Sequence, residues 1–162
     1  LVDEVILSQT GVKEAPTLLV DEAFENGTTG WGAYFTTNLA LSRSAKEGNY
    51  SLVSTVRENW YSGPGYNVHG LLEQGKTYQV SVDVYLESDQ RSRDSAQIWL
   101  YYVDNTGGHW TRLAQKNVSM SQWNSLETEF TVSGEGTITQ MRLHVFGPQP
   151  STDVYIDNLS VK

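Results

Sequence analysis

Two tryptophans stand at strand–turn junctions, where a ring can be held rigidly at the surface of a domain. Trp60 follows an alternating segment, Tyr50–Val56, and precedes the turn-forming residues Ser62–Gly65. Because glycine and proline favour a bend there, we expect the indole of Trp60 to lie at the rim of the fold. Trp110 begins the strand that returns from a predicted hairpin loop over residues 104–108. Exposed, rigid rings of this kind can stack on a flat, apolar face of a ligand.

Few other residues have the spacing that catalysis or metal binding requires. The histidines His69, His109 and His144 are far apart in the sequence and match no metal-ligand spacing. No serine lies in a Gly-x-Ser-x-Gly turn, and no glycine-rich loop leads into a helix. Some hydrolases need only two facing carboxylates, but Glu127 and Glu129 alternate along a predicted strand, which is typical of a solvated face. Binding is therefore favoured over catalysis, and a facing carboxylate pair stays open as an alternative.

Composition narrows the classes of partner. The chain has 162 residues, no cysteine and a formal net charge of −8. Its 11 Lys and Arg are scattered, so nucleic acid, which needs clustered positive charge, is not an expected partner. No apolar run approaches the roughly 18 residues that cross a membrane. Since no signal peptide is visible either, the sequence is expected to be part of a longer chain.

Hydrophobic alternation predicts an all-β domain. Thr77–Leu86 places its valines on one face, and Ser95–Val103 places Trp99 and Tyr101 on the face opposite Ile98. We nevertheless expect Trp99, like Trp31 and Trp123, to serve core or edge packing. Further strands are predicted at Thr17–Val20, Trp31–Thr36, Leu39–Arg43, Tyr50–Val56, Asn124–Val132, Thr137–Phe146 and Asp153–Val161.

About ten short antiparallel strands, with turn signals roughly every ten residues and no helical stripe, predict a β-sandwich with jelly-roll topology. Residues 1–16 are polar after a short apolar run and contain glycine and proline. They are predicted to be a linker or an edge segment. Residues 17–162 are predicted to be the sandwich domain.

Short motifs along the chain together resemble those of a known family. In order they are Ala23-Phe24-Glu25, Gly30-Trp31-Gly32, Gly48-x-Tyr50-Ser51-Leu52, Trp60-x-x-Gly63-Pro64, Gly75-x-Thr77-Tyr78, Trp123 and Val154-Tyr155-Ile156-Asp157-Asn158-Leu159. The chain from Leu18 to Lys162 is similar to carbohydrate-binding modules, most of all to family 22, within the wider group of families 4, 9 and 16. Family 22 comprises the xylan-binding jelly-roll modules of xylanases.

The resemblance assigns an aromatic platform to two positions. Trp60 matches the main stacking tryptophan of the family, and Trp110 falls where a second stacking aromatic residue, usually tyrosine, is found. Each ring is expected to cover the apolar face of a sugar.

Four further sugar-binding positions depart from the family pattern. Asn67 falls where aspartate is common, and Tyr34 lies near a position often held by arginine. His144 falls where tyrosine is usual, and Phe146 where a glutamate often binds sugar hydroxyls. The resemblance therefore implies that the platform is retained while the polar groups that select the sugar have changed. Weaker or broader binding is expected.

The resemblance also implies a structural calcium ion. In the family this ion ties an N-terminal segment to a turn and to the last strand. The corresponding ligands here are the side chains of Glu25 and Asp157, with carbonyl oxygens near Ala23 and Asn49. Hard oxygen ligands from distant segments suit Ca²⁺. A pair of solvated surface acids is the alternative.

The function that the resemblance implies is non-catalytic. A secreted, extracellular, monomeric module would hold an attached glycoside hydrolase, such as a xylanase, near a β-1,4-linked plant polysaccharide, either xylan or mixed-linkage β-glucan. Two alternatives remain: a glycan-active enzyme domain, and a structural spacer with little or no sugar binding.

Overall fold

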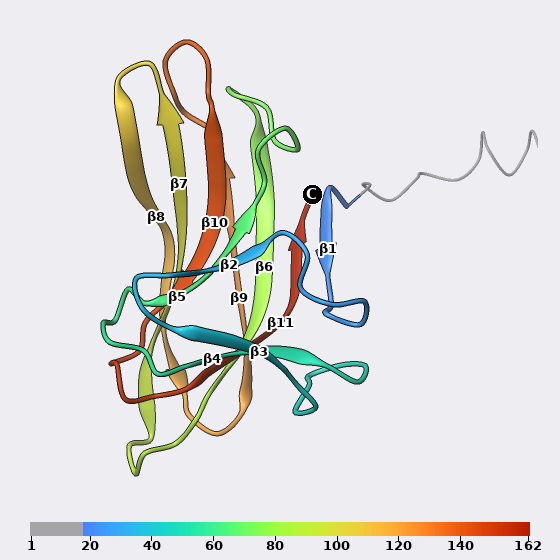
Figure 1. The fold of residues 1–162 in the computed structure, drawn as a ribbon, viewed down its shortest axis with the longest axis vertical. Coiled ribbons are helices and arrows are strands. Elements are labelled where there is room, and N and C mark those ends of the chain that lie inside the picture. The colour runs from blue at the N-terminus through green and yellow to red at the C-terminus, as the bar shows by residue number, and fades with distance from the viewer. Residues whose placement is uncertain (1–17) are drawn as a thin grey trace, which may run out of the picture.

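Eleven strands and no helix make up residues 18–162, the part of the chain that the computed structural model describes (Figure 1). The strands are β1 (Val20–Glu22), β2 (Trp31–Tyr34), β3 (Asn38–Ser42), β4 (Ser51–Thr55), β5 (Gly63–Asn67), β6 (Thr77–Leu86), β7 (Arg93–Asp104), β8 (Gly107–Ser119), β9 (Trp123–Thr131), β10 (Gln140–Phe146) and β11 (Val154–Val161). The all-β prediction is confirmed. Within the same residues there is no helix with the length and hydropathy of a membrane span.

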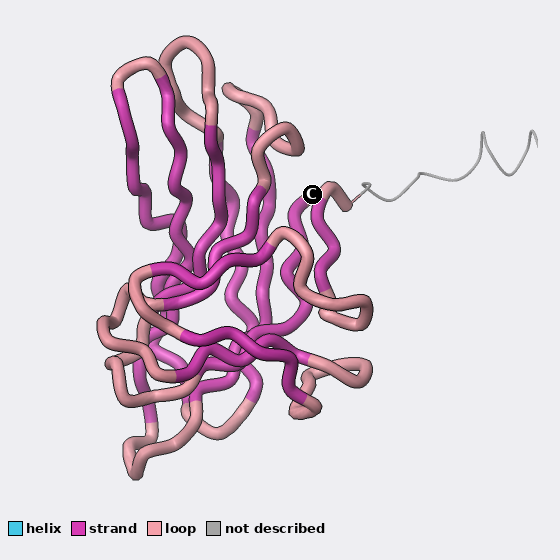
Figure 2. The backbone as a smooth tube through the Cα atoms, viewed as in Figure 1, coloured by secondary structure: helices cyan, strands magenta, loops and turns pink. Residues whose placement is uncertain are grey.

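The strands form two antiparallel sheets. One sheet has the order β3-β4-β11-β6-β9, with β1 also paired to β11, and the other has the order β2-β5-β10-β7-β8. Most neighbours within a sheet are not consecutive in sequence, so the chain crosses repeatedly between the two layers. Figure 2 shows how loops join the strands at both ends of the sandwich. The predicted β-sandwich is confirmed.

Alternating side chains build the core between the sheets. In β6 the buried positions Val80, Val82 and Val84 alternate with more exposed ones. The facing sheet contributes buried Ile98 and Leu143 in the same manner. Because side chains on a strand point to opposite faces in turn, burial of one set leaves the other set on the outer face. A binding site on the face of a sheet must therefore be formed by these outward-facing side chains.

Residues Gly63–Gly65 belong to strand β5, which corrects the prediction of a bend there. β5 pairs with β2 and β10, and its glycines allow side chains from both neighbours to lie over it. A Cβ built on Gly65 would lie 2.6 Å from Cε1 of His144. Glycine is therefore needed for close packing rather than for a turn. The bend lies earlier, in the loop that carries Trp60 and Tyr61.

Other boundaries differ by a few residues. β10 begins at Gln140 rather than Thr137, and the first described strand is Val20–Glu22. The linker or edge segment predicted over residues 1–16 lies outside the described residues, as does the start of the strand predicted from Thr17.

Three loops gather at one side of the sandwich (Figure 1). They join β2 to β3, β4 to β5, and β10 to β11. The Gly147 N–H donates to the Trp60 carbonyl at 2.7 Å, and the Ser62 hydroxyl donates to the Phe35 carbonyl. These bonds fix the loops to one another beside the end of the five-stranded sheet.

Candidate functional site

The outer face of the five-stranded sheet carries most of the predicted site. Across β10, Arg142 is opposite Asn67 and Tyr101, and His144 is opposite Gly65 and Trp99. Residues directly opposite each other in an antiparallel pair share a face. Residues that are distant in sequence thus come together across the three neighbouring strands β5, β10 and β7.

A cleft of about 340 Å³ lies at one end of this face. Only aromatic side chains line it: Phe35, Trp60, Tyr61, Trp99, Trp110 and Phe146. Nine large apolar side chains are well exposed among the described residues, and four of the nine line this cleft. Clustering of exposed apolar rings on a soluble domain marks a binding surface.

The rings in the cleft brace one another. Trp60 packs edge-on against Tyr61 at 5.4 Å between centroids, and Trp110 lies 4.6 Å from Tyr101. Trp60 is 44% exposed and Trp110 is 39% exposed, so part of each side chain is buried and the rest is open to solvent. Such contacts fix the ring orientations before a ligand arrives.

Phe35 reaches the cleft through an unusual backbone conformation. Its φ is 59° and that of Thr36 is 67°, both in the left-handed region that non-glycine residues avoid. The Ser62 hydroxyl, which donates to the Phe35 carbonyl, and the Glu58 N–H, which donates to the Thr36 carbonyl at 3.3 Å, hold this turn. Left-handed residues held in this way are typical of functional loops.

Arg57 holds the loop that carries Trp60. Its guanidinium is 5% exposed and donates to six carbonyl oxygens, those of Asn59, Trp60, Ser62, Pro148, Gln149 and Thr152. Burial lowers the pKa of Arg57 to about 10, so it remains charged at neutral pH. One side chain thereby ties the β4–β5 loop to the β10–β11 loop.

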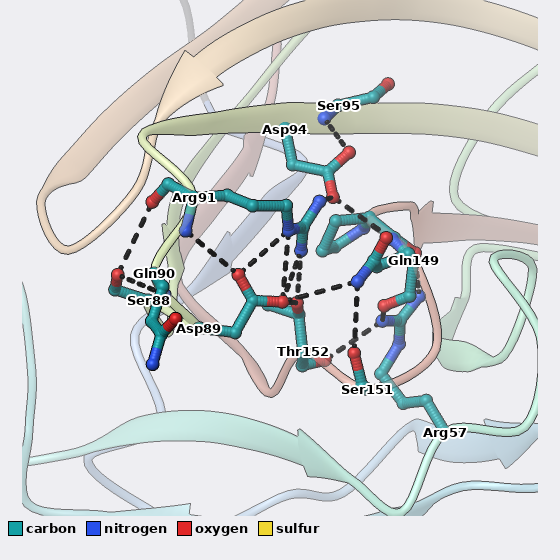
Figure 3. A network of polar contacts seen from close by, with 11 residues as sticks. Arg57, Ser88, Asp89, Gln90, Arg91, Asp94, Ser95, Gln149, Ser151 and Thr152 are labelled. Carbon is teal, nitrogen blue, oxygen red and sulfur yellow. Dashed lines mark hydrogen bonds and ion pairs between the residues drawn. The ribbon is translucent and has the colours of Figure 1, made fainter.

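A second polar network, which includes Asp89 and Arg91 from the loop between β6 and β7, also holds the β10–β11 loop (Figure 3). Arg91 pairs with Asp89 at 2.8 Å and with Asp94, and it donates to the Thr152 hydroxyl at 2.8 Å. The main-chain N–H of Gln149 donates to Asp94 Oδ2 at 3.3 Å. The β10–β11 loop is therefore held both by Arg57 and by the network around Arg91.

A polar hollow continues the face beyond the cleft. It is lined by Tyr34, Asn67, His69, Thr139, Gln140, Met141 and Arg142. The guanidinium carbon of Arg142 lies 4.3 Å from the centroid of Tyr34 and 4.4 Å from that of Tyr101. Two rings thus flank one cationic group.

His144 lies beneath the rings, between the cleft and the hollow. It has no exposed surface, and it packs against Tyr34 at 4.7 Å and Trp110 at 4.8 Å. Its Nε2 is 3.1 Å from Nε of Arg142. Burial, and then the charge of Arg142, lowers the pKa of His144 to about 3.

The predicted sugar-binding residues fall into three groups. Trp60, Trp110 and Phe146 line the cleft, whereas Tyr34 and Asn67 line the hollow. His144, being buried, supports both groups from below.

Three residues of the cleft were not among the predicted ones: Phe35, Tyr61 and Trp99. Trp99 was expected to serve core or edge packing, and its place in the cleft corrects that expectation, although strand alternation does put it on the face opposite Ile98. Tyr61 adjoins Trp60 in sequence, whereas nothing in the local pattern marks Phe35.

The predicted calcium ligands converge on the loop between β3 and β4. Glu25 accepts the Asn49 N–H at 2.7 Å and the Tyr50 N–H at 2.9 Å. Asp157 is fully buried and accepts the N–H groups of Lys46 and Glu47 at 3.1 and 3.2 Å. A solvated acid pair is therefore not the right description of Asp157.

The donor set is compatible with a calcium ion. Asp157 Oδ2 accepts two N–H groups, whereas Asp157 Oδ1 and both Glu25 carboxylate oxygens accept one each and keep a free lone pair. Main-chain carbonyls of Ala23 and Asn49 belong to the same segments and could add further oxygen ligands. No group of three or more His, Cys, Asp or Glu side chains with metal-binding geometry occurs in residues 18–162. Any ion here would depend on carbonyl oxygens.

Glu127 and Glu129 lie on β9, where they are opposite Ser81 and Gln79 of β6. Together with Lys162 they line a polar hollow on the other sheet, which contains no aromatic ring. They are remote from the aromatic cleft.

Comparison with known proteins places this geometry in context. The model of the carbohydrate-binding domain family CBM_4_9 matches residues 17–152. Endo-1,4-β-xylanase A of Thermoanaerobacterium saccharolyticum is 32% identical over 141 residues, which are 85% of this chain and 12% of that enzyme. The chain thus spans a small part of its curated relative.

Solved structures share the fold. The CBM22-2 xylan-binding domain of Paenibacillus barcinonensis Xyn10C has a TM-score of 0.80 at 21% identity, over 89% of this chain and 98% of that domain. The CBM22-1–GH10 modules of Clostridium thermocellum xylanase 10B, solved with xylohexaose, have a TM-score of 0.82 at 18% identity, over 91% of this chain and 29% of that one.

The resemblance drawn from the motifs is confirmed at the level of the family. The family model spans most of the chain, and the structural neighbours are family 22 modules of xylanases. The chain therefore belongs to the CBM_4_9 family of carbohydrate-binding domains and is a non-catalytic binding module.

Proposed function

We propose that this module binds β-1,4-xylan through the aromatic cleft and thereby holds an attached glycoside hydrolase near plant cell wall polysaccharide. The observation that carries the proposal is the group of four exposed rings in a cleft lined only by aromatic side chains. The xylan-binding domains and the xylanase with which the chain compares support the choice of polymer. A structural spacer has no use for such exposed rings.

The energy available from the cleft is modest. Covering one sugar face with an indole removes roughly 60 Å² from water, which at about 25 cal/mol/Å² contributes roughly 1.5 kcal/mol. Two rings and a few hydrogen bonds give a dissociation constant of about 0.1 mM to 1 µM after association costs. Such affinity suits a module that raises the local concentration of an enzyme.

Mixed-linkage β-glucan is the second candidate. Phe146 offers no hydrogen-bonding group to the cleft, and an apolar ring covers the C–H face of glucose as well as that of xylose. The cleft alone therefore gives no reason for a strict choice between these polymers.

We further propose that the module is secreted, acts as a monomer and holds calcium through Glu25, Asp157 and the carbonyls of Ala23 and Asn49.

Affinity electrophoresis on xylan and on mixed-linkage glucan tests the proposal. Trp60→Ala and Trp110→Ala are each expected to abolish retention while the melting temperature stays within a few degrees. Trp123→Ala is the matched control, because Trp123 packs on Tyr85 on the other sheet. Retention that survives both cleft substitutions, or no retention of the parent on either glycan, would refute the proposal. Release of reducing sugar is expected from neither polymer.

A further inference from the structure

Charge is divided unequally between the two outer faces of the sandwich. The strand registers place Arg93, Arg112 and Arg142 on the outer face of the five-stranded sheet, and none of the paired residues on that face is Asp or Glu. On the other sheet the exposed face carries Asp83, Glu127 and Glu129. A chain with net charge −8 thus keeps the strands of its candidate binding face free of carboxylates.

This arrangement lets an anionic ligand approach one side only. Packed sheets lie about 10 Å apart, and the Debye length is about 8 Å at physiological ionic strength. The acidic face is therefore largely screened from a ligand on the opposite face. The nearby arginines then dominate the local potential.

Arg142 has the geometry of a prepared anion receptor. The rings of Tyr34 and Tyr101 flank its guanidinium at 4.3 and 4.4 Å, which restricts its rotamers. Its Nε donates to His144 at 3.1 Å and its Nη1 to Gln140 at 3.4 Å. Within residues 18–162, Nη2 has no protein acceptor and no carboxylate forms an ion pair with Arg142.

The unused guanidinium edge is suited to a carboxylate. A planar fork of N–H donors binds two carboxylate oxygens side by side, which a hydroxyl group cannot match. Arg142 lines the polar hollow with Asn67, His69 and Gln140, all of which can hydrogen-bond to a sugar. A carboxylate on a sugar is the ligand that this chemistry recognises.

The hollow and the cleft are placed to act on one polymer. Arg142 and Phe146 stand four residues apart on β10, about 13 Å at 3.3 Å per residue. A polysaccharide chain stacked in the aromatic cleft can therefore extend over Arg142. A substituent carried by a neighbouring sugar unit would meet the guanidinium.

We propose that the hollow around Arg142 is a subsite for the carboxylate of a uronic acid substituent, so that acid-substituted xylan is the preferred ligand. The inference rests on the proposed binding of xylan in the aromatic cleft. Arg142 supplies the selectivity, and the rings supply affinity that is common to neutral chains.

The test compares a xylan carrying uronic acid groups with the same polymer after its carboxyls have been reduced to alcohols. Titration calorimetry gives the two dissociation constants. The parent module is expected to bind the acidic polymer about tenfold more tightly, since a hydrogen-bonded charge pair replaces neutral contacts. Arg142→Gln is expected to bring the ratio close to one, and Arg142→Lys to leave it in between.

Arg43→Gln is the matched control, because it removes the same charge beside Tyr50, after β3 of the other sheet. It should leave the ratio unchanged. Equal binding of both polymers by the parent would overturn the inference and leave the proposed function intact. A preference that persists in Arg142→Gln would also overturn it. If the folded parent binds neither polymer, the proposed function itself fails.

Discussion

Burial keeps His144 neutral, and the neighbouring Arg142 adds to this effect and fixes which ring nitrogen carries the proton. A guanidinium only donates, so His144 Nε2 accepts from Arg142 Nε and the ring proton lies on Nδ1. That Nδ1 is buried and has no hydrogen-bond partner among the described residues. A second proton on Nε2 would face the N–H of Arg142. Burial, and then this conflict with the charge of Arg142, lowers the pKa of His144 to about 3.

The lowered pKa predicts a loss of stability in mild acid. The unfolded chain binds a proton at His144 near pH 6.5, whereas the folded chain does so only near pH 3. Between these values the unfolded state holds more protons, so stability falls as pH falls. From pH 7.5 to pH 5 the free energy of unfolding should drop by about 2 kcal/mol on this account.

Urea denaturation of the parent and of His144→Gln at both pH values measures this drop. The variant should lose most of the difference, because its side chain does not titrate. His69→Gln changes an exposed histidine and should keep it. A His144→Gln protein with the full pH dependence of the parent would show that another group is responsible.

The β4–β5 loop depends on one buried side chain. Arg57 is the common donor to six carbonyls of two loops, including that of Trp60. Replacing it leaves buried acceptors without donors, which costs about 3–5 kcal/mol. Arg57→Met should therefore destabilise the fold and also weaken glycan binding, since Trp60 loses its support. Arg57→Lys should recover part of both.

A core variant separates positioning from mere stability. Val80→Ala removes buried methyl groups from β6, a strand of the sheet that does not carry the cleft. It should lower the melting temperature without a comparable loss of affinity at a temperature where the protein is folded. If Val80→Ala and Arg57→Met weaken binding equally for equal loss of stability, Arg57 has no special part in positioning Trp60.

At the level of strands, local patterns predicted most elements and missed one. Valine alternation identified β6, and the opposite facing of Ile98 and Trp99 identified the two faces of β7. β5 was missed because its glycine-rich start, Gly63–Gly65, is the composition of a turn. Those glycines serve the packing of Tyr34 and His144, which belong to other strands. A contact between distant segments leaves no periodic signal in either of them.

The same reason limits prediction of the site. Trp60 was identifiable because the end of a strand is a local feature, although the bend lies at Trp60 and Tyr61 and not at Gly63–Gly65. Phe35 was not, since its place in the cleft depends on the Ser62 hydroxyl and a left-handed backbone. The stacking of Arg142 between Tyr34 and Tyr101 depends on the registers of three strands. Sandwich topology fixes these registers, and single-sequence patterns do not.

Across the whole molecule, the two outer faces differ in composition. The five-stranded sheet collects aromatic rings and arginines, while the six-stranded sheet carries the solvating acids. β11 lies between β4 and β6 in the latter, with β1 paired to it, so the first and last described strands are neighbours. A contact that holds the β3–β4 loop against β11 therefore stabilises the six-stranded sheet, not the candidate binding face on the other sheet.

The predicted calcium ion would act at this contact between the β3–β4 loop and β11. Glu25 and Asp157 already accept N–H groups from residues 46–50, and an ion held by them and by nearby carbonyls would pin the same loop. A ligand that binds only the folded state stabilises it by about 2.7 kcal/mol at a hundredfold excess over its Kd. For a domain of this size the melting temperature should rise by several degrees.

Thermal melts of the parent and of Asp157→Asn, in calcium and in a chelator, test the ion. Asparagine keeps the size of the buried side chain and retains an oxygen that can accept an N–H, so the variant is designed to fold while losing ionic affinity. The parent should melt several degrees lower in chelator, and the variant should melt at the same temperature in calcium and in chelator.

Magnesium should not replace calcium, because it demands a smaller and more regular oxygen cage. Parent melts that coincide with and without chelator would show that hydrogen bonds alone close the sandwich. Glycan affinity should change little in either case, since this loop is held against the six-stranded sheet and the aromatic cleft lies on the other one.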